Sequence, residues 1–343
     1  MFAEGPNVAV LAAAGSRKSQ HVIDTALEAA GRVAIVTYTV ENRAQLVRRI
    51  EAARGTVPPN IEMYGWLEFL LAHGAKPFQA SITGQPFGIR GLNFDGQPSR
   101  FTSKAQVQKY YFDRRRDAYA RNLADFVIEA NRASEGAVID RICRIYDTLL
   151  VDEVQDMVGW DLDVLDLLLD APMNVLLVGD VRQHTYGTNR SNRNQRYKAA
   201  GMSTWFEERV DRCRLERWTA SFRCHQHICD FADRIYPELP TTQSVGVADT
   251  GHDGVFTISR AQVASYMEEH APVVLRHDKR SDTLGLPAYN FGLVKGSTFD
   301  RVLIFPTRRM AAFVEHGDPE QLQDRARFYV AVTRARHSVA FVI

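Results

Sequence analysis

Short apolar segments alternate with segments of helical periodicity along the first part of the chain. Five apolar runs rich in β-branched residues predict strands over residues 7–11, 33–37, 61–64, 149–151 and 175–178, and the intervening pattern predicts a helix over 19–30. Gly31 is expected to end that helix as its C′ residue. Nearly continuous apolar strands joined by helices indicate a parallel sheet with both faces covered, so the sequence predicts an α/β fold.

The pattern changes between about residues 71 and 144. A stretch rich in Gly, Pro and Asn at 84–103 predicts a loop, and the pattern of 104–132 predicts a long helical stretch. Apolar runs at 255–259, 273–276, 302–306 and 338–343 then predict a second series of strands. We therefore expect two parallel-sheet lobes, the first formed by 1–72 and 145–212 with a small helical insertion at 73–144, and the second formed by 213–343.

Composition narrows the class of protein. The chain has 343 residues, 45% of them hydrophobic, and no apolar run approaches the roughly 20 residues that cross a membrane. The first residues lack a basic region and a long apolar stretch, so no secretory signal is expected and the protein is predicted to be cytoplasmic. A net charge of +1 means that any contact with nucleic acid has to come from a local groove.

The cysteines give little support for a metal site. Cys224, His225, His227 and Cys229 lie close together, but their spacing is not that of a zinc finger or ribbon. We expect reduced thiols on a buried helix.

The stretch "AAAGSRKSQ", residues 12–20, follows the first predicted strand and opens the first predicted helix. Such a loop presents backbone N–H groups to phosphate, while Lys18 reaches the terminal phosphates and the Ser19 hydroxyl binds Mg²⁺. The usual pattern has glycine where Ala12 and Arg17 stand here. A side chain at positive φ costs about 1 kcal/mol, so this stretch alone leaves a nucleotide site and a chance match equally open.

Two further predicted strands end in polar residues. In "LLVDEVQD", Asp152 is placed to hold Mg²⁺ and Glu153 to deprotonate an attacking water; an acidic cluster at a helix start is the alternative. In "NVLLVGDVRQHTY", Asp180 and Gln183 follow the next strand. Three neighbouring strand ends of this kind favour phosphoryl-transfer chemistry.

The ordered motifs resemble those of the UvrD/Rep/PcrA-like superfamily-one helicases. They are "AAAGSRKS", "TYT", "DEVQD", "GDVRQHTY", "SFRC", "KGSTFDRVLIFPT" and "RFYVAVTRAR", and they extend from near the N-terminus almost to residue 343. The resemblance implies two RecA-like lobes with ATP in the cleft between them, and Mg²⁺ as the metal.

The resemblance also implies roles for individual residues. Lys18 and Ser19 would contact the phosphates and the metal, Asp152 the metal and Glu153 the water, while Gln183 would sense the γ-phosphate. Phe222 aligns with an aromatic that stacks on adenine, and Arg223 and Arg334 with arginines that reach the γ-phosphate; a surface arginine is the alternative for Arg334. The residues implied to bind ATP are Ala14, Gly15, Ser16, Arg17, Lys18, Ser19, Gln20, Phe222, Lys295 and Gly296.

Contacts with single-stranded DNA are implied for Thr37, Tyr38, Thr39 and Tyr186. Stacking on a base would suit Tyr38 and Tyr186, although Tyr38 also fits a core aromatic at a strand end.

The chain departs from the family at several positions. No glutamine-bearing adenine motif precedes the first strand, and Thr298 and Thr188 stand where the family usually has a ribose-reading glutamate and a stacking aromatic. Only about 70 residues separate Arg223 from Lys295. The large helical insertion of the second lobe is therefore expected to be missing.

These observations predict a Mg²⁺-dependent ATPase that translocates on single-stranded DNA, with or without unwinding of duplex. The alternative is a nucleotide-responsive, DNA-sensing regulatory subunit. Compact UvrD-like proteins that resemble this one accompany OLD-family nucleases, which combine an ATPase with a Toprim domain, in anti-phage systems such as Gabija, so such a nuclease is the implied partner. Arg17→Gly is expected to leave hydrolysis within about tenfold.

Overall fold

The computed structural model describes residues 7–185 and 193–343, which fold into two compact α/β units. The second unit comprises Ala12–Lys18, Asp180–Thr185 and Arg217–Ile343. The first unit comprises the other described residues, 7–11, 19–179 and 193–216. Two short segments that follow strands of the first sheet are thus grouped with the second unit.

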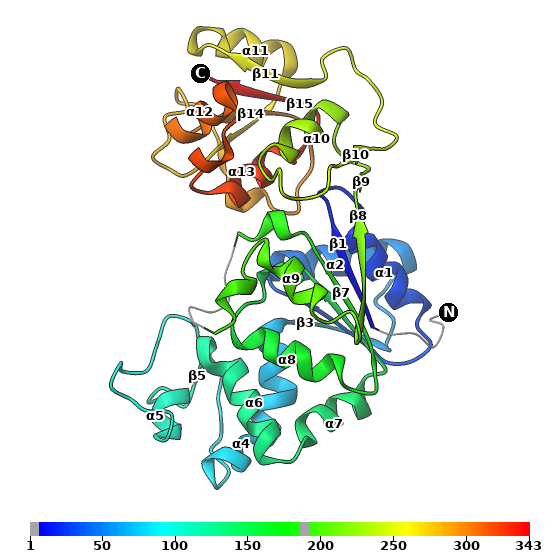
Figure 1. The fold of residues 1–343 in the computed structure, drawn as a ribbon, viewed down its shortest axis with the longest axis vertical. Coiled ribbons are helices and arrows are strands. Elements are labelled where there is room, and N and C mark those ends of the chain that lie inside the picture. The colour runs from blue at the N-terminus through cyan, green and yellow to red at the C-terminus, as the bar shows by residue number, and fades with distance from the viewer. Residues whose placement is uncertain (1–6, 186–192) are drawn as a thin grey trace. The chain divides into compact units, whose positions relative to one another are not determined.

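The first sheet, of which β1, β3, β7 and β8 are labelled in Figure 1, has six strands in the order β3-β2-β6-β7-β1-β8. Adjacent strands from β3 to β1 pair in parallel. The strands are β1 (Asn7–Ala12), β2 (Val33–Thr37), β3 (Ile61–Gly65), β6 (Thr148–Asp152), β7 (Asn174–Gly179) and β8 (Cys213–Trp218). The helices outside the insertion are α1 (Lys18–Glu28), α2 (Val40–Arg54), α8 (Trp160–Leu169) and α9 (Gly201–Glu207). The sheet order places β8 beside β1, whereas the predicted boundary at residue 213 assigned that segment to the second lobe.

The strands are apolar because both faces of the sheet are covered. All five residues of β2 and all five of β6 are buried. This confirms the predicted parallel α/β sheet, whose central strands bury apolar side chains on both faces.

The prediction that Gly31 ends the first helix as its C′ residue is wrong. Helix α1 ends at Glu28, and Gly31 is not among the glycines with positive φ. A Cβ atom at this position would lie 2.8 Å from the Cβ of Asp147, whose carboxylate accepts a hydrogen bond from the Arg32 N–H at 2.7 Å. Gly31 therefore makes room for a neighbouring side chain.

The insertion between β3 and β6 is mostly helical. It contains α3 (Trp66–Phe69), a π-helix (Leu70–Ala75), α4 (Lys76–Thr83), α5 (Val107–Tyr111), α6 (Leu123–Ala133) and α7 (Ala137–Ile145), with two-residue strands β4 (Leu92–Asn93) and β5 (Ala118–Tyr119). The long helical stretch predicted over 104–132 is wrong, because it is broken between α5 and α6. The Asp113 carboxylate accepts the N–H groups of Arg115 and Asp117 at 2.8 and 3.0 Å, and this local turn replaces helical hydrogen bonds.

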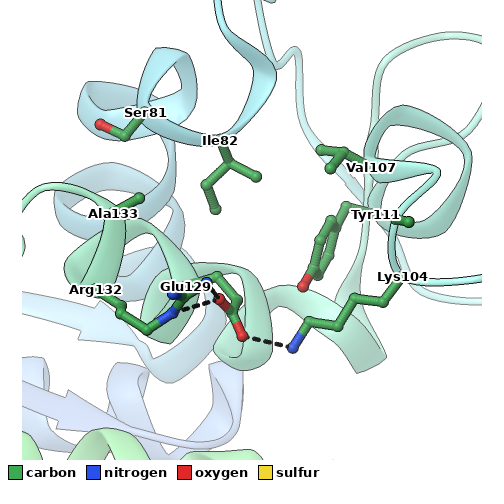
Figure 2. A pocket seen from close by; sticks show the side chains of 9 residues that line it. Ser81, Ile82, Lys104, Val107, Tyr111, Glu129, Arg132 and Ala133 are labelled. Atoms are coloured by element: carbon green, nitrogen blue, oxygen red, sulfur yellow. Dashed lines mark hydrogen bonds and ion pairs between the residues drawn. The ribbon is translucent and has the colours of Figure 1, made fainter.

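A cavity of about 380 Å³ lies within this insertion (Figure 2). On one side Glu129 accepts hydrogen bonds from Lys104 and Arg132, at 2.8 and 2.7 Å. Apolar side chains, among them Ile82 and Val107, line other parts of it. None of the described residues predicted to bind ATP or DNA lines this cavity.

The second unit is built on a five-stranded parallel sheet in the order β11-β15-β14-β12-β13. Its strands are β11 (Gly254–Ile258), β12 (Val273–Arg276), β13 (Tyr289–Asn290), β14 (Phe299–Phe305) and β15 (Ala335–Val342). Its helices are α10 (Gln226–Asp233), α11 (Val263–His270), α12 (Arg308–His316) and α13 (Arg325–Val332), and a two-stranded ribbon joins β9 (Ala220–Ser221) to β10 (Gln243–Ser244). The second predicted strand series is therefore confirmed.

Among residues 7–185 and 193–343, the structure contains no helix with the length and apolar character of a membrane span.

Candidate nucleotide-hydrolysis site

The loop after β1, predicted to bind phosphate, has two residues in the left-handed backbone region. Gly15 and Arg17 both have positive φ, 80° and 65°. The strained conformation expected at Arg17 is thus present, and it costs about 1 kcal/mol relative to glycine.

Two side chains of this loop fit an anionic ligand. Lys18 is only 8% exposed and forms no hydrogen bond or ion pair with any residue in the described parts of the chain. The buried Ser16 hydroxyl likewise has no hydrogen-bond partner there. Buried polar groups without partners are costly, so the two side chains are suited to phosphate oxygens.

The structure brings Ser19 and Asp152 together within the first unit. Ser19 lies in the first turn of α1 and Asp152 is the last residue of β6. The Ser19 Oγ donates a hydrogen bond to Asp152 Oδ2 at 2.9 Å. A hydroxyl and a carboxylate at this separation are oxygen ligands of the kind that Mg²⁺ prefers, so the donor set fits this metal.

Glu153 is held beside Asp152 by its own backbone and by Gln155. Its φ of 61° and ψ of 40° are left-handed, and its N–H donates to Asp152 Oδ1 at 3.0 Å. The Gln155 side-chain amide donates to Glu153 Oε2. Gly179, at the end of β7, leaves the space that Gln155 fills, because a Cβ there would lie 3.2 Å from the Gln155 N.

Gln183 is the centre of a buried polar network in the second unit. Its side-chain amide donates to Asp180 Oδ2 at 2.7 Å, and its Oε1 accepts from Arg334 Nη2 at 3.4 Å. Lys295 Nζ donates to the Gln183 carbonyl oxygen at 3.3 Å. Arg334 is 1% exposed and also donates to the carbonyl of Val330, which argues against a surface arginine.

Phe222 and Arg223 follow strand β9, within the second unit. The Phe222 ring is 39% exposed, and the Arg17 guanidinium carbon lies 4.0 Å from its centroid. Arg223 donates to the carbonyl of Thr333 at 3.2 Å, next to Arg334 in sequence. Arg17 therefore contacts the residue predicted to stack on adenine.

Three other predicted nucleotide residues have structural roles here. The Ala14 N–H donates to the Tyr329 hydroxyl at 3.3 Å. Gln20 hydrogen-bonds Asp24 and Arg49. Gly296 has a φ of 87°, a backbone conformation that favours glycine.

The residues predicted to contact DNA differ in their surroundings. Thr37 is buried at the end of β2, and Thr39 caps α2 by accepting the Asn42 N–H at 3.1 Å. Tyr38 is partly buried, and this burial, with Asp161 and Asp156 nearby, raises the pKa of its phenol to about 12. Tyr186 and Thr188 lie outside the described residues.

The sequence reasoning missed several residues that support the site. Gln155 and Gly179 position Glu153, and Tyr329 and Thr333 hold Ala14 and Arg223. The motif "DEVQD" contained Gln155, so the signal was present there. Tyr329 and Thr333 stand in the motif "RFYVAVTRAR", but their partners Ala14 and Arg223 are distant in sequence, so the motif gave no signal for these contacts.

Comparison with known proteins gives the fold and the family of the chain. The structure is similar to the crystal structure of arterivirus nonstructural protein 10 (helicase), with a TM-score of 0.50 and 16% identity over 98% of this chain and 59% of that one. Its complex with DNA gives a TM-score of 0.51 at 16% identity, over 98% and 61%. The Pif1 helicase from Bacteroides, in complex with ADP-AlF3 and ssDNA, aligns over 99% and 89% at 11% identity, with a TM-score of only 0.39.

The arterivirus likeness shows the fold alone, and the chain spans about three fifths of the length of those helicases. A search of curated proteins finds no match. The sequence profile of a family described as "Viral superfamily 1 RNA helicase core domain" matches residues 130–343. This match covers more than half of the 343 residues, and the chain therefore belongs to the viral superfamily 1 RNA helicase core domain family.

Proposed function

We propose that this protein is a Mg²⁺-dependent ATPase of the UvrD-like type that translocates on single-stranded DNA. The observation that carries the proposal is the 2.9 Å hydrogen bond between Ser19 and Asp152, which pairs the hydroxyl of a phosphate loop with a strand-end carboxylate. Lys18, buried and without an acceptor among the described residues, supports it. Membership of a helicase family supports nucleotide-dependent action on nucleic acid.

Each of these residues has a distinct role in the proposed reaction. Ser19 and Asp152 would hold Mg²⁺, which supplies positive charge to the terminal phosphates. Lys18 binds the same phosphates, and Glu153 accepts a proton from the attacking water. Arg223 and Arg334 are proposed to stabilise the negative charge that develops on the transferred phosphoryl group.

Nucleic-acid binding is supported by the surface of the helical insertion. Residues 84–121 contain eight Arg or Lys and three Asp, although the whole chain has a net charge of only +1. Phe94 and Phe101 are 71% and 82% exposed in this segment. The Arg90 N–H donates to the Arg116 carbonyl at 3.1 Å, so the loop and the basic turn lie side by side. Cations and exposed aromatic rings together suit a phosphate backbone and its bases.

The proposal is tested by measuring phosphate release from ATP with and without single-stranded DNA or RNA. Lys18→Ala and Glu153→Gln should each abolish most turnover, whereas Glu153→Gln should retain ADP binding. Lys76→Ala and Glu268→Gln, at exposed positions away from the site, are the matched controls. Turnover that persists in both site variants would refute the assignment. Strand separation on a tailed duplex then distinguishes a helicase from a translocase.

A second candidate is a nucleotide-responsive regulatory subunit that reports the state of DNA to an OLD-family nuclease in an anti-phage complex. The buried network around Gln183 favours it, because this one residue contacts Asp180 and Arg334 through its side chain and Lys295 through its carbonyl oxygen, and so suits a nucleotide sensor. This candidate predicts nucleotide binding without turnover, and a complex with such a nuclease in size-exclusion chromatography.

A further inference from the structure

The contact between Arg17 and Phe222 is specific to this chain's version of the phosphate loop. Arg17 stands where the usual loop has glycine, and its guanidinium carbon lies 4.0 Å from the centroid of the Phe222 ring. Both side chains are exposed at their outer edges. A planar cation over an aromatic ring at this distance forms a favourable cation–π pair.

The backbone fixes the two partners next to each other. The Phe222 N–H donates to the carbonyl of Gly15 at 2.9 Å, and the Ala13 N–H donates to the carbonyl of Trp218 at 2.9 Å. A Cβ at Gly15 would lie 2.6 Å from the Ser221 Oγ, so the loop and the segment before Phe222 are in close contact. The pairing therefore follows from the local fold of the second unit.

The Arg17–Phe222 pair leaves no room for a third planar group between the guanidinium and the ring. Stacked groups need about 3.5–4 Å between their planes, which is already the separation of Arg17 and Phe222. Arg17 belongs to the loop that would hold the phosphates, so it covers the face of Phe222 that is turned toward that loop. A nucleobase can stack on this face only after the guanidinium has moved away.

We propose that Arg17 sets the affinity for the nucleobase by competing with it for the ring of Phe222. The inference rests on the proposed function, in which Phe222 is the base platform and the loop binds phosphate.

The test compares ADP with inorganic pyrophosphate, each with Mg²⁺, by isothermal titration calorimetry. Both probes use the phosphate loop, but only ADP has a base. The ratio of the pyrophosphate Kd to the ADP Kd therefore isolates the base contribution, and changes in loop strain or charge cancel from it. Arg17→Gly removes the competitor and the strain, while Arg17→Ala removes the competing cation but keeps a side chain at the strained position.

Both Arg17 variants should raise this ratio about two- to fivefold, the magnitude of an exposed cation–π pair. Phe222→Ala should lower it, and adding Arg17→Ala to Phe222→Ala should change nothing further. A ratio that is unchanged or lowered in Arg17→Ala would overturn the inference while the proposed function stands. If neither probe binds the wild-type chain, the proposed function itself fails, and this inference with it.

Discussion

Replacing Gly179 by alanine should damage hydrolysis through Glu153. The added Cβ would lie 2.9 Å from Val154 Cγ1 and 3.2 Å from the Gln155 N, and closer still to Gln155 Oε1. Val154 and Gln155 are fully buried, so neither can move aside into solvent. Overpacking of this kind costs about 2 kcal/mol, which lowers the melting temperature of a unit of this size by roughly 4–8 °C. Because Gln155 donates to Glu153, kcat should fall about ten- to hundredfold.

Gly55→Ala is the matched control for this experiment. Gly55 ends α2 with a φ of 80°, and no atom lies within 4 Å of an added Cβ. The variant should lose about 1 kcal/mol of stability through backbone strain alone and keep its kcat. Phosphate release and thermal melting are measured on both variants. A Gly179→Ala protein with the kcat of the wild type would refute the positioning role of Gln155.

Three further outcomes are expected. Asp152→Asn should raise the Mg²⁺ concentration needed for half-maximal turnover, as measured by a metal titration of phosphate release. Tyr38→Ala should weaken binding of fluorescent single-stranded DNA by about 1–3 kcal/mol, whereas Thr307→Ala should lower only stability, by about 1 kcal/mol, because Thr307 caps α12. Burial, and to a smaller extent the charge of Arg141, lowers the pKa of His73. The His73 side chain therefore takes up a proton near pH 6.5 in the unfolded chain but only at lower pH in the folded protein. Stability should therefore fall as the pH drops below 6.5, with a smaller slope of melting temperature against pH in His73→Gln.

The sheets could be predicted from the sequence because their strands are buried on both faces. A run such as 33–37 has to be apolar throughout to be covered on both sides, and it matches β2 residue for residue. The strand ends were then predictable as well, because polar residues after such a run lie at the carboxyl edge of a parallel sheet. This reasoning placed Asp152 and Ser19 near a common site, and the two are hydrogen-bonded.

The remaining features depend on contacts that a local pattern does not encode. The break at Asp113 arises from a side chain that competes for backbone N–H groups, although the surrounding residues favour helix. Gly31 was assigned to a helix end, but its neighbour in space is Asp147, over a hundred residues away in sequence. The stacking of Arg17 on Phe222 likewise joins segments that are far apart in the chain.

Backbone strain provides a separate argument for the site. Arg17 and Glu153 both have positive φ, 65° and 61°, where side chains are disfavoured by about 1 kcal/mol each. For Glu153 the strain is offset by hydrogen bonds to Asp152 and from Gln155. For Arg17 the only compensating side-chain contact within the described residues is the ring of Phe222. Glycine at position 17 would give the same loop at lower cost, so the presence of arginine is best explained by a function of its side chain. The role of the Arg17 side chain is therefore measured by the ratio of the pyrophosphate Kd to the ADP Kd, and not by stability.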